Sequence, residues 1–241
     1  MTRLFASDLH LDPSRPEVTL QFLRFLEGPA REAQSLFLLG DLFEAWLGDD
    51  APGPLGSTLA DALADLAASG VGLFVMQGNR DFLLGERFCA RVGATLLSDP
   101  TIVTIEGEQV LLTHGDVLCT GDTSYQRLRA LVHDPEVQAA FLSLSLERRR
   151  SLAAQARAGS RAHLARAEEY ITDVTQEAVE QVMADAAVHT MVHGHTHRPA
   201  VHRFRAGDRD CTRIVLGDWH EQGSFLRWDE HGYALEILER A

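Results

Sequence analysis

Five short polar motifs contain the side chains that commonly bind divalent metal ions. Each motif follows a short apolar run of the chain and carries an imidazole, carboxylate or amide group. The motifs are Asp8-Leu9-His10, Gly40-Asp41, Gly78-Asn79-Arg80-Asp81, His114-Gly115-Asp116 and Gly194-His195-Thr196-His197. Imidazole combined with carboxylate suits ions such as Mn²⁺, Zn²⁺ or Fe²⁺, and the absence of cysteine from the motifs argues against a structural zinc site. The five motifs together predict a metal centre.

Taken singly, each motif also has an ordinary structural explanation as a turn or a helix cap. Together they supply enough imidazoles, carboxylates and amide oxygens for two ions. In extended backbone, Asp8 and His10 would point to the same face, and so would His195 and His197. Two neighbouring ions need a bridging carboxylate, and Asp41 is the best candidate because Gly40 leaves room beside it.

Apolar runs of strand length alternate with helical patterns, which predicts an α/β fold. Buried strands are expected at residues 4–7, 35–40, 71–77, 110–113 and 190–193, and helices at 17–26, 55–68 and 84–92. Strands without intervening helices are expected at 101–106, 199–204, 213–216, 224–228 and 234–238. This order predicts one domain over residues 1–241, built as two mixed β-sheets packed face to face and flanked by helices. The five motifs follow the strands, where open α/β sheets place their sites.

Residues 122–187 are rich in Ala, Leu, Arg and Glu and have no strand pattern, which predicts an inserted helical cap over the site. The chain has a net charge of −13, yet residues 121–166 contain eight arginines and four acidic residues. All 22 basic residues are Arg, whose planar donors suit phosphate. The run Arg148-Arg149-Arg150 is typical of a solvated helix face, although basic residues beside the apolar residues 141–146 could also meet an anionic membrane.

Composition excludes several other classes of protein. The acidic net charge argues against a general nucleic-acid binder. The longest apolar runs are too short to cross a bilayer, and the N-terminus has no secretory pattern, so a cytoplasmic location is expected. Cys89, Cys119 and Cys211 form no CxxC pair and are interpreted as reduced, structural thiols.

The ordered motifs resemble those of the calcineurin-like metallophosphoesterase family. The resemblance implies a pair of mixed β-sheets flanked by helices, and a hydroxide between two ions as the nucleophile. It implies catalytic roles for Asp41, Asn79, Arg80, His114 and His195. It also implies that one ion is held by Asp8, His10, Asp41 and His197, and the other by Asp41, Asn79, His114 and His195.

Arg80 departs from the pattern of most of that family. The usual residue after Gly-Asn is a histidine, which can protonate a leaving alcohol. Arginine cannot deliver a proton near neutral pH, so the leaving group should need none. A phosphate qualifies, because its second pKa is only about 6. The sequence therefore favours cleavage of a pyrophosphate over that of an alkyl phosphomonoester.

Residues 41–50, 78–85 and 193–202 resemble one subfamily, the UDP-2,3-diacylglucosamine diphosphatases of lipid A biosynthesis. The resemblance implies two Mn²⁺ ions, attack on the α-phosphorus, and release of UMP and 2,3-diacylglucosamine 1-phosphate. It implies acyl chains in the cap, and peripheral attachment to the cytoplasmic face of the inner membrane of a Gram-negative bacterium, with no nucleic acid and no obligate protein partner. Substrate contacts are implied for Asn79, Arg80, Asp122, Ser160 and His195. Leu164 and Ala167 stand where that subfamily has polar or basic contacts, which leaves Arg157, Arg161 or Arg166 to supply them.

Two alternatives differ from this reading. An inactive scaffold of the same fold would have lost metal ligands, whereas every expected ligand type is present. A phosphatase or nuclease of the same superfamily would keep the metals and change the substrate, but Arg80, the acidic charge and the apolar insertion argue against both. His193 is open to two interpretations, a neighbour of the ligands or a buried strand residue, and Asp116 could orient a ligand histidine or form a turn.

Overall fold

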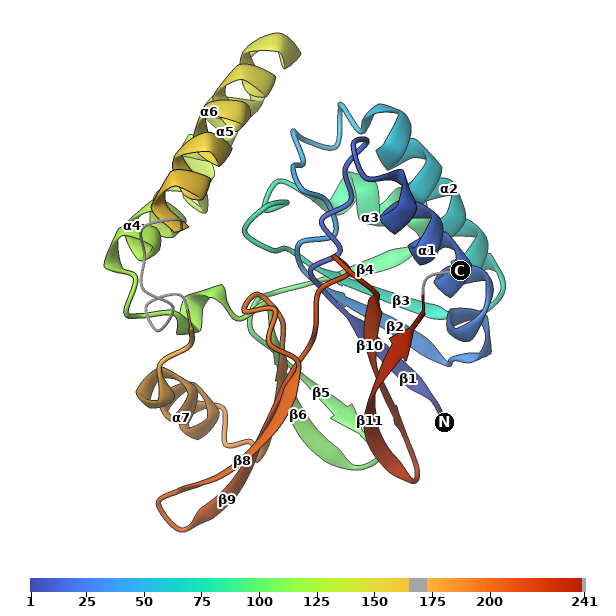
Figure 1. Cartoon of the computed structure of the whole chain (residues 1–241), viewed down its shortest axis with the longest axis vertical. Coiled ribbons are helices and arrows are strands. Elements are labelled where there is room, and N and C mark those ends of the chain that lie inside the picture. Colours follow the sequence, from blue (N-terminus) through green and yellow to red (C-terminus); the bar gives the residue numbers. More distant parts are fainter. Residues whose placement is uncertain (165–172, 240–241) are drawn as a thin grey trace.

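The computed structural model describes residues 1–164 and 173–239, with only the backbone described for residues 160–164. Two β-sheets lie face to face, and helices cover the outer face of each (Figure 1). The described strands of the first sheet have the order β11-β10-β1-β2-β3-β4, and those of the second β5-β6-β7-β9-β8. Both sheets mix parallel and antiparallel pairs, which confirms the predicted fold class.

The strands are short, as expected for a domain of this size. The first sheet contains β1 (Arg3–Ala6), β2 (Ser35–Leu39), β3 (Gly72–Met76), β4 (Ala94–Leu97), β10 (Gly223–Asp229) and β11 (Gly232–Leu238). The second contains β5 (Thr101–Ile105), β6 (Glu108–Thr113), β7 (Thr190–His193), β8 (Ala200–Ala206) and β9 (Arg209–Val215). The described helices are α1 (Pro16–Glu27), α2 (Gly53–Ala68), α3 (Glu86–Val92), α4 (Thr123–Val132), α5 (Pro135–Leu142), α6 (Leu146–Leu164) and α7 (Gln176–Asp185).

The central strands are apolar on both faces because each face lies in a different core. In β2, Leu36 and Leu38 pack toward α1, α2 and α3, whereas Phe37 and Leu39 face the second sheet. Alternate residues of a strand point to opposite faces, so a strand covered on both sides shows a continuous apolar run. These buried runs place the carboxyl ends of β1, β2 and β3 side by side.

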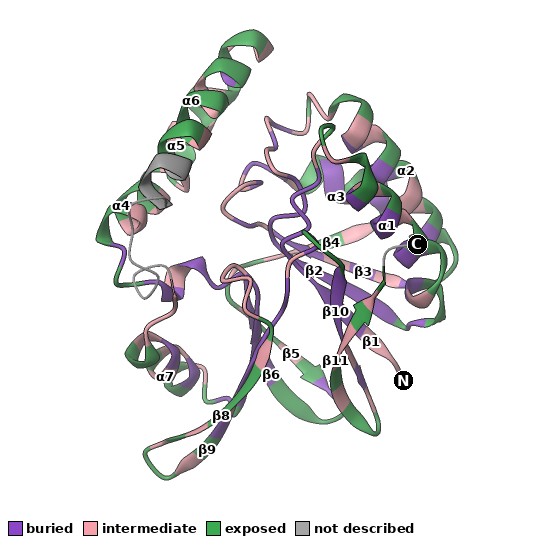
Figure 2. Ribbon diagram, viewed as in Figure 1, coloured by how far each residue is buried: buried purple, intermediate pink, exposed green. Residues whose placement is uncertain are grey.

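The helical segment predicted as a cap has two differently packed parts. Helices α4, α5 and α6 project from one side of the sheets, and Figure 2 shows that they are largely exposed. Helix α7 instead packs on the outer face of the second sheet, where Val179 and Met183 contact a core that includes Leu111 and Met191. The limits of the cap over residues 122–187 stay a prediction.

Arg149 joins the projecting helices to the body of the protein. Its guanidinium donates to the two carboxylate oxygens of Asp50 at 2.7 and 2.9 Å, and to the carbonyl of Leu47 at 3.0 Å. Its Nε donates to the carbonyl of Leu144 at 3.0 Å. The expectation of a solvated face for this arginine run is wrong at Arg149, which is 6% exposed, although Arg148 and Arg150 are exposed. The difference follows from position, because Arg149 faces acceptors of Leu47, Asp50 and Leu144, and its planar guanidinium can satisfy several of them at once.

Arg149→Ala is expected to loosen the contact between α6 and the loop around Asp50. Hydrogen bonds to charged groups contribute about 1.5–3 kcal/mol, so local opening should become easier by about that amount. Amide hydrogen exchange across residues 47–50 and 142–150 measures the change. Arg148→Ala is the matched control on the exposed side of the same turn. Equal exchange in both variants would show that the Arg149 contact does not restrain the helices.

Candidate metal centre and active site

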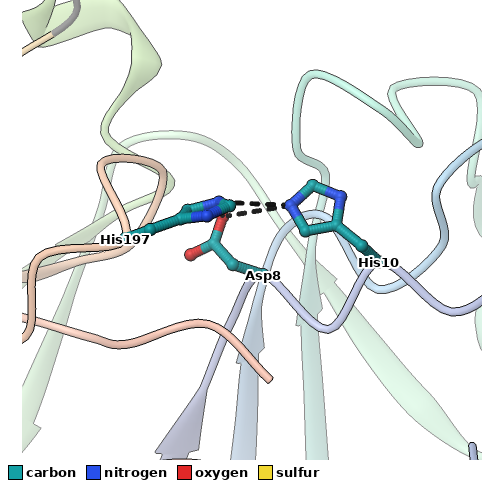
Figure 3. Close-up of side chains that lie close together, drawn as sticks. All are labelled: Asp8, His10 and His197. Carbon is teal, nitrogen blue, oxygen red and sulfur yellow. Dashed lines mark hydrogen bonds and ion pairs between the residues drawn. The ribbon is translucent and has the colours of Figure 1, made fainter. Parts of the chain in front are cut away.

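Asp8, His10 and His197 form the first cluster of metal-ligating side chains, shown in Figure 3. Their ligand atoms all lie within 4.8 Å of one another. His197 Nε2 is 3.2 Å from His10 Nε2 and 3.3 Å from Asp8 Oδ1. The cluster joins the loop after β1 to the loop after β7, although His10 and His197 are 187 residues apart in sequence.

Asp41, His114 and His195 form the second cluster, again with ligand atoms within 4.8 Å. Asn79 belongs to the same group of side chains: its Oδ1 is 3.0 Å from His114 Nε2 and 2.9 Å from His195 Nδ1. Four loops after β2, β3, β6 and β7 supply these residues. The prediction that the motifs meet where the strands end is confirmed.

Asp41 lies between the two clusters. Its Oδ2 is 3.6 Å from His10 Nε2 in the first cluster, and its Oδ1 is 3.7 Å from His114 Nε2 in the second. Each carboxylate oxygen thus faces a different group of ligands. This is the geometry that a bridging carboxylate requires.

The donor set fits two divalent cations. Asp8 is fully buried, and its Oδ2 accepts hydrogen bonds from Ser7 Oγ at 2.5 Å and from the His195 backbone N–H at 2.8 Å. The other oxygen, Oδ1, is buried, accepts no hydrogen bond from the described part of the chain, and faces His197. Buried carboxylate oxygens are rarely left without a partner, and a cation would satisfy this one.

The backbone that presents these ligands is left-handed rather than extended. Asp8, His10, Asp41, His195 and His197 all have positive φ, between 47° and 68°. The inference that Asp8 and His10 share a face of extended backbone is therefore wrong, and the same holds for His195 and His197. Their side chains converge because each loop turns sharply after its strand. Non-glycine residues adopt this conformation at an energetic cost, and such residues concentrate at functional sites.

Glycines allow the loops to approach one another closely. A Cβ at Gly78 would collide with Asp41, and one at Gly194 would collide with Ser7 and Asp8. At Gly40 a Cβ would lie 2.5 Å from His114 Nδ1. The room that the sequence predicted beside Asp41 is therefore taken up by neighbouring loops and by His114.

Contacts to the ring nitrogen that faces away from the clusters fix the orientation of three histidines. The carboxylates of Glu44 and Asp218 lie 3.1 and 2.9 Å from Nδ1 of His10 and His197 respectively. His114 Nδ1 is 2.9 Å from the Leu39 carbonyl oxygen. Such contacts leave the opposite ring nitrogen directed at the cluster. The pKa of Glu44 lies below its ordinary value. Burial alone would raise this pKa, but the hydrogen bond to His10 and the charge of Arg80 together outweigh burial. No role was predicted for either carboxylate: Glu44 lies within residues 41–50 but is not one of the motif residues, and Asp218 lies outside all the motifs.

Asp81 holds the loops after β2 and β3 together. Its buried carboxylate accepts backbone hydrogen bonds from Gly78 at 2.8 Å and Leu42 at 2.7 Å, and from Asp41 and Phe43 at 3.2 Å each. Asp81 is thus a positioning residue for Asp41 and Asn79. The sequence offered a signal, since Asp81 closes the Gly78-Asn79-Arg80-Asp81 motif.

Asp81→Ala is expected to lower both stability and metal affinity, because buried backbone N–H groups lose their acceptor. Each unsatisfied buried donor costs about 1–3 kcal/mol. The free energy of unfolding and the affinity for Mn²⁺ should be measured together. Asp61→Ala, at an exposed aspartate of α2, serves as the control. Unchanged affinity for Mn²⁺ in a folded Asp81→Ala variant would exclude the positioning role.

Asp116 connects the site to α4 rather than to a ligand histidine. Its carboxylate accepts from Tyr125 Oη at 2.5 Å and from Arg129 Nε at 2.8 Å. Burial and the charge of Asp116 raise the pKa of Tyr125, so its hydroxyl remains a donor. Asp122 is the N-cap of α4 and accepts from the Tyr125 backbone N–H at 2.9 Å.

A largely apolar cavity of about 370 Å³ adjoins the second cluster. Asn79 and Arg80 line it on the side of the ligands, and Leu128, Phe141 and Leu152 are among the apolar residues contributed by α4, α5 and α6. Among the described residues, Arg80 Nε is buried without a hydrogen-bond partner, and Nη1 lies 3.9 Å from a carboxylate oxygen of Glu44. A cationic donor therefore stands between the metal ligands and an apolar space.

Of the cap residues predicted to contact substrate, only some fall within the described part of the chain. Arg157 lines the apolar cavity. The side chains of Ser160, Arg161 and Leu164, together with Arg166 and Ala167, lie outside the described residues.

His193 is a buried strand residue that contacts Arg213 and the Gly194 carbonyl, and burial lowers its pKa to about 3. Burial raises the pKa of Cys89 and Cys119 to about 12, which agrees with structural thiols.

The sequence of the chain matches known proteins over its whole length. Residues 1–199 match the model of the calcineurin-like phosphoesterases. The chain belongs to this family. It is 53% identical, over 100% of both chains, to a UDP-2,3-diacylglucosamine hydrolase of Stenotrophomonas maltophilia. It is 49% identical to the hydrolase of the same name from Xanthomonas campestris, over 99% of each chain.

Solved structures agree on the fold. A dimetal phosphatase from Danio rerio superposes with a TM-score of 0.55 at 15% identity, covering 100% of this chain and 96% of that one. An archaeal phosphodiesterase superposes with a TM-score of 0.51 at 12% identity, covering 99% and 100%. Family and geometry together make the chain a metal-dependent hydrolase with two candidate metal sites. Within the described residues, no helix combines the length and hydropathy needed to cross a bilayer.

Proposed function

We propose that this chain hydrolyses the pyrophosphate bond of UDP-2,3-diacylglucosamine, giving UMP and 2,3-diacylglucosamine 1-phosphate. Relatives that share about half of its residues over the full chain are named for hydrolysis of this compound. The pairing of Arg80 with the apolar cavity is the observation that carries the proposal. An acylated sugar phosphate needs an apolar space for its chains next to a cation for its phosphate, and the cavity provides both.

The metal ligands would be Asp8, His10 and His197 for one ion and Asn79, His114 and His195 for the other, with Asp41 shared. Two bound divalent ions supply Lewis acidity and lower the pKa of a water molecule. Oxygen and nitrogen ligands of this kind suit Mn²⁺, which we propose as the ion. Glu44, Asp218 and the Leu39 carbonyl hold the imidazoles in the orientation that binding requires.

Arg80 would bind the phosphate that leaves. Its backbone N–H donates to Asp41 Oδ1 at 2.7 Å, which ties the arginine to the bridging carboxylate. The Nε, which is buried and has no partner among the described residues, and the rest of the guanidinium can donate to phosphate oxygens. A leaving phosphate needs no proton, so the replacement of the usual histidine by arginine is consistent with this role.

Arg80→Ala is expected to lower turnover on UDP-diacylglucosamine by about 10²–10³, the usual effect of removing one donor that stabilises developing charge. The wild-type enzyme should also prefer this substrate strongly over p-nitrophenyl phosphate. Arg148→Ala provides a folded control with an exposed arginine. Comparable wild-type rates on the two substrates would contradict the role assigned to Arg80.

Phosphatase and nuclease activity, the alternatives within the superfamily, can be compared directly with hydrolysis of UDP-diacylglucosamine. UDP-diacylglucosamine, a phosphopeptide and single-stranded DNA should be assayed in parallel with metal-loaded protein. We expect hydrolysis of the first only. Faster hydrolysis of the phosphopeptide or the DNA would reassign the chain to a phosphatase or a nuclease.

We also propose that the enzyme attaches peripherally to the cytoplasmic face of the inner membrane of a Gram-negative bacterium. Leu128 and Leu131 are 48% and 55% exposed on α4, and Arg148 and Arg150 are exposed on α6. Apolar and basic side chains together favour binding to an anionic lipid surface. We expect the protein to sediment with vesicles containing phosphatidylglycerol and to be released by high salt. Absence of sedimentation at low salt would contradict this proposal.

A further inference from the structure

A second, polar cavity lies beside the first cluster of ligands. Its volume is about 410 Å³, and Asp12, Arg15, Glu44, Arg157 and His220 are among the residues that line it. His10 also lines it, which places it against the first cluster, whereas Asn79 and Arg80 line the apolar cavity against the second. Glu44 and Arg157 line both cavities and therefore form their common boundary.

We infer that the polar cavity is the subsite for the nucleoside half of the substrate, and this inference rests on the proposed function. A nucleotide-linked acyl sugar has two ends of opposite chemistry, joined by the pyrophosphate. The apolar cavity suits the acylated end. With the pyrophosphate over the two clusters, the other end lies toward the polar cavity. This orientation places the α-phosphate of UMP beside the Asp8 cluster and the leaving phosphate beside Arg80.

Arg15 and His220 form a preorganised wall of the polar cavity. Arg15 Nη2 donates to the carbonyl of His220 at 3.2 Å, and its Nη1 lies 3.3 Å from His220 Nδ1. The His220 backbone N–H donates to Asp218 Oδ1 at 3.0 Å, which connects this wall to the carboxylate that orients His197. Guanidinium donors match the carbonyl oxygens of a pyrimidine, and an imidazole ring can stack on its face.

Asp12 offers the acceptor that a ribose requires. Its Oδ1 is fixed by the Ser14 backbone N–H at 2.8 Å and by Ser14 Oγ at 2.5 Å. A carboxylate has further lone pairs and can accept from a ribose hydroxyl while keeping these bonds. The cavity thus combines donors for a base with an acceptor for a sugar, in a volume typical of small-molecule sites.

The experiment measures binding of the two products separately to Mn²⁺-loaded protein by calorimetry. Arg15→Ala should weaken binding of UMP by about tenfold or more, since it removes charged donors, and should leave binding of diacylglucosamine 1-phosphate unchanged. Arg24→Ala, at an exposed arginine of α1, the helix that Arg15 precedes, should bind both products as the wild type does. Asp12→Ala should abolish any preference of the protein for UMP over deoxy-UMP.

The outcomes separate this inference from the proposed function. If the wild type releases UMP from UDP-diacylglucosamine but Arg15→Ala and Asp12→Ala bind UMP normally, the subsite assignment is wrong and the proposed function stands. If both variants lose both products equally, the cavity is not a nucleoside subsite. If the wild type releases no UMP at all, the proposed function itself fails. Selective loss of UMP supports the inference.

Discussion

Asp41→Ala is expected to lower turnover by several orders of magnitude while the fold remains intact. Asp41 directs one carboxylate oxygen at His10 and the other at His114, so its loss removes a ligand from both candidate metal sites at once. Asp41→Asn retains the shape of the side chain but loses the negative charge, and it should also impair binding of both ions. Circular dichroism, Mn²⁺ content and turnover on UDP-diacylglucosamine measure the three quantities concerned.

The control for this experiment is Asp61→Asn, a carboxylate of α2 that pairs with Arg91 on the surface. It should keep full activity and full metal content. Near-normal turnover and two bound ions in a folded Asp41→Ala variant would refute the bridging role. Loss of only one ion would assign Asp41 to a single site.

Removal of the acyl chains from the substrate is expected to lower kcat/KM by several powers of ten. Each methylene buried in the apolar cavity contributes about 0.8 kcal/mol, so a few contacts per chain are enough for this loss. Binding energy from the chains would serve to place the pyrophosphate over the metal centre, so kcat should fall as well as KM rise. UDP-glucosamine and UDP-diacylglucosamine at matched concentrations give the comparison.

Variants of α4 and α6 locate the acyl contacts. Leu128 and Leu152 line the apolar cavity, whereas Leu131 is exposed on α4 away from its lining. Leu128→Asp and Leu152→Asp should reduce efficiency on the acylated substrate and leave UDP-glucosamine unaffected, and Leu131→Asp should affect neither in detergent solution. Equal wild-type efficiencies on the two substrates would show that the cavity does not recognise lipid.

The sequence predicted the fold because buried strands carry a strong local signal. The strand at residues 35–39 is buried at every position and apolar after Ser35, and such runs alternate with the amphipathic patterns of α1 and α2. Strand β4 was not predicted, because its four residues follow α3 directly and none of them is fully buried. A half-exposed strand of four residues shows too little alternation of apolar and polar residues to be predicted from sequence.

The sequence predicted which side chains form the two clusters but not the backbone that positions them. These candidate ligands could be predicted because short motifs end their strands, and the structure brings them together. Their left-handed backbone could not be inferred, since residue type predicts positive φ well only for glycine. Asp218 lies 21 residues beyond His197 along the chain and Arg149 meets Asp50 across the fold, so both contacts depend on tertiary structure that local patterns do not encode.

The most direct measurement of the central claim is hydrolysis of UDP-diacylglucosamine in water enriched in the heavy isotope of oxygen, followed by mass spectrometry of both products. The orientation argued above directs water to the α-phosphorus, with the acylated sugar phosphate leaving beside Arg80. We therefore predict that the heavy oxygen appears in UMP and not in diacylglucosamine 1-phosphate, and that Asp41→Ala forms neither product at a comparable rate. Heavy oxygen in diacylglucosamine 1-phosphate, or no hydrolysis by metal-loaded protein, would contradict the account.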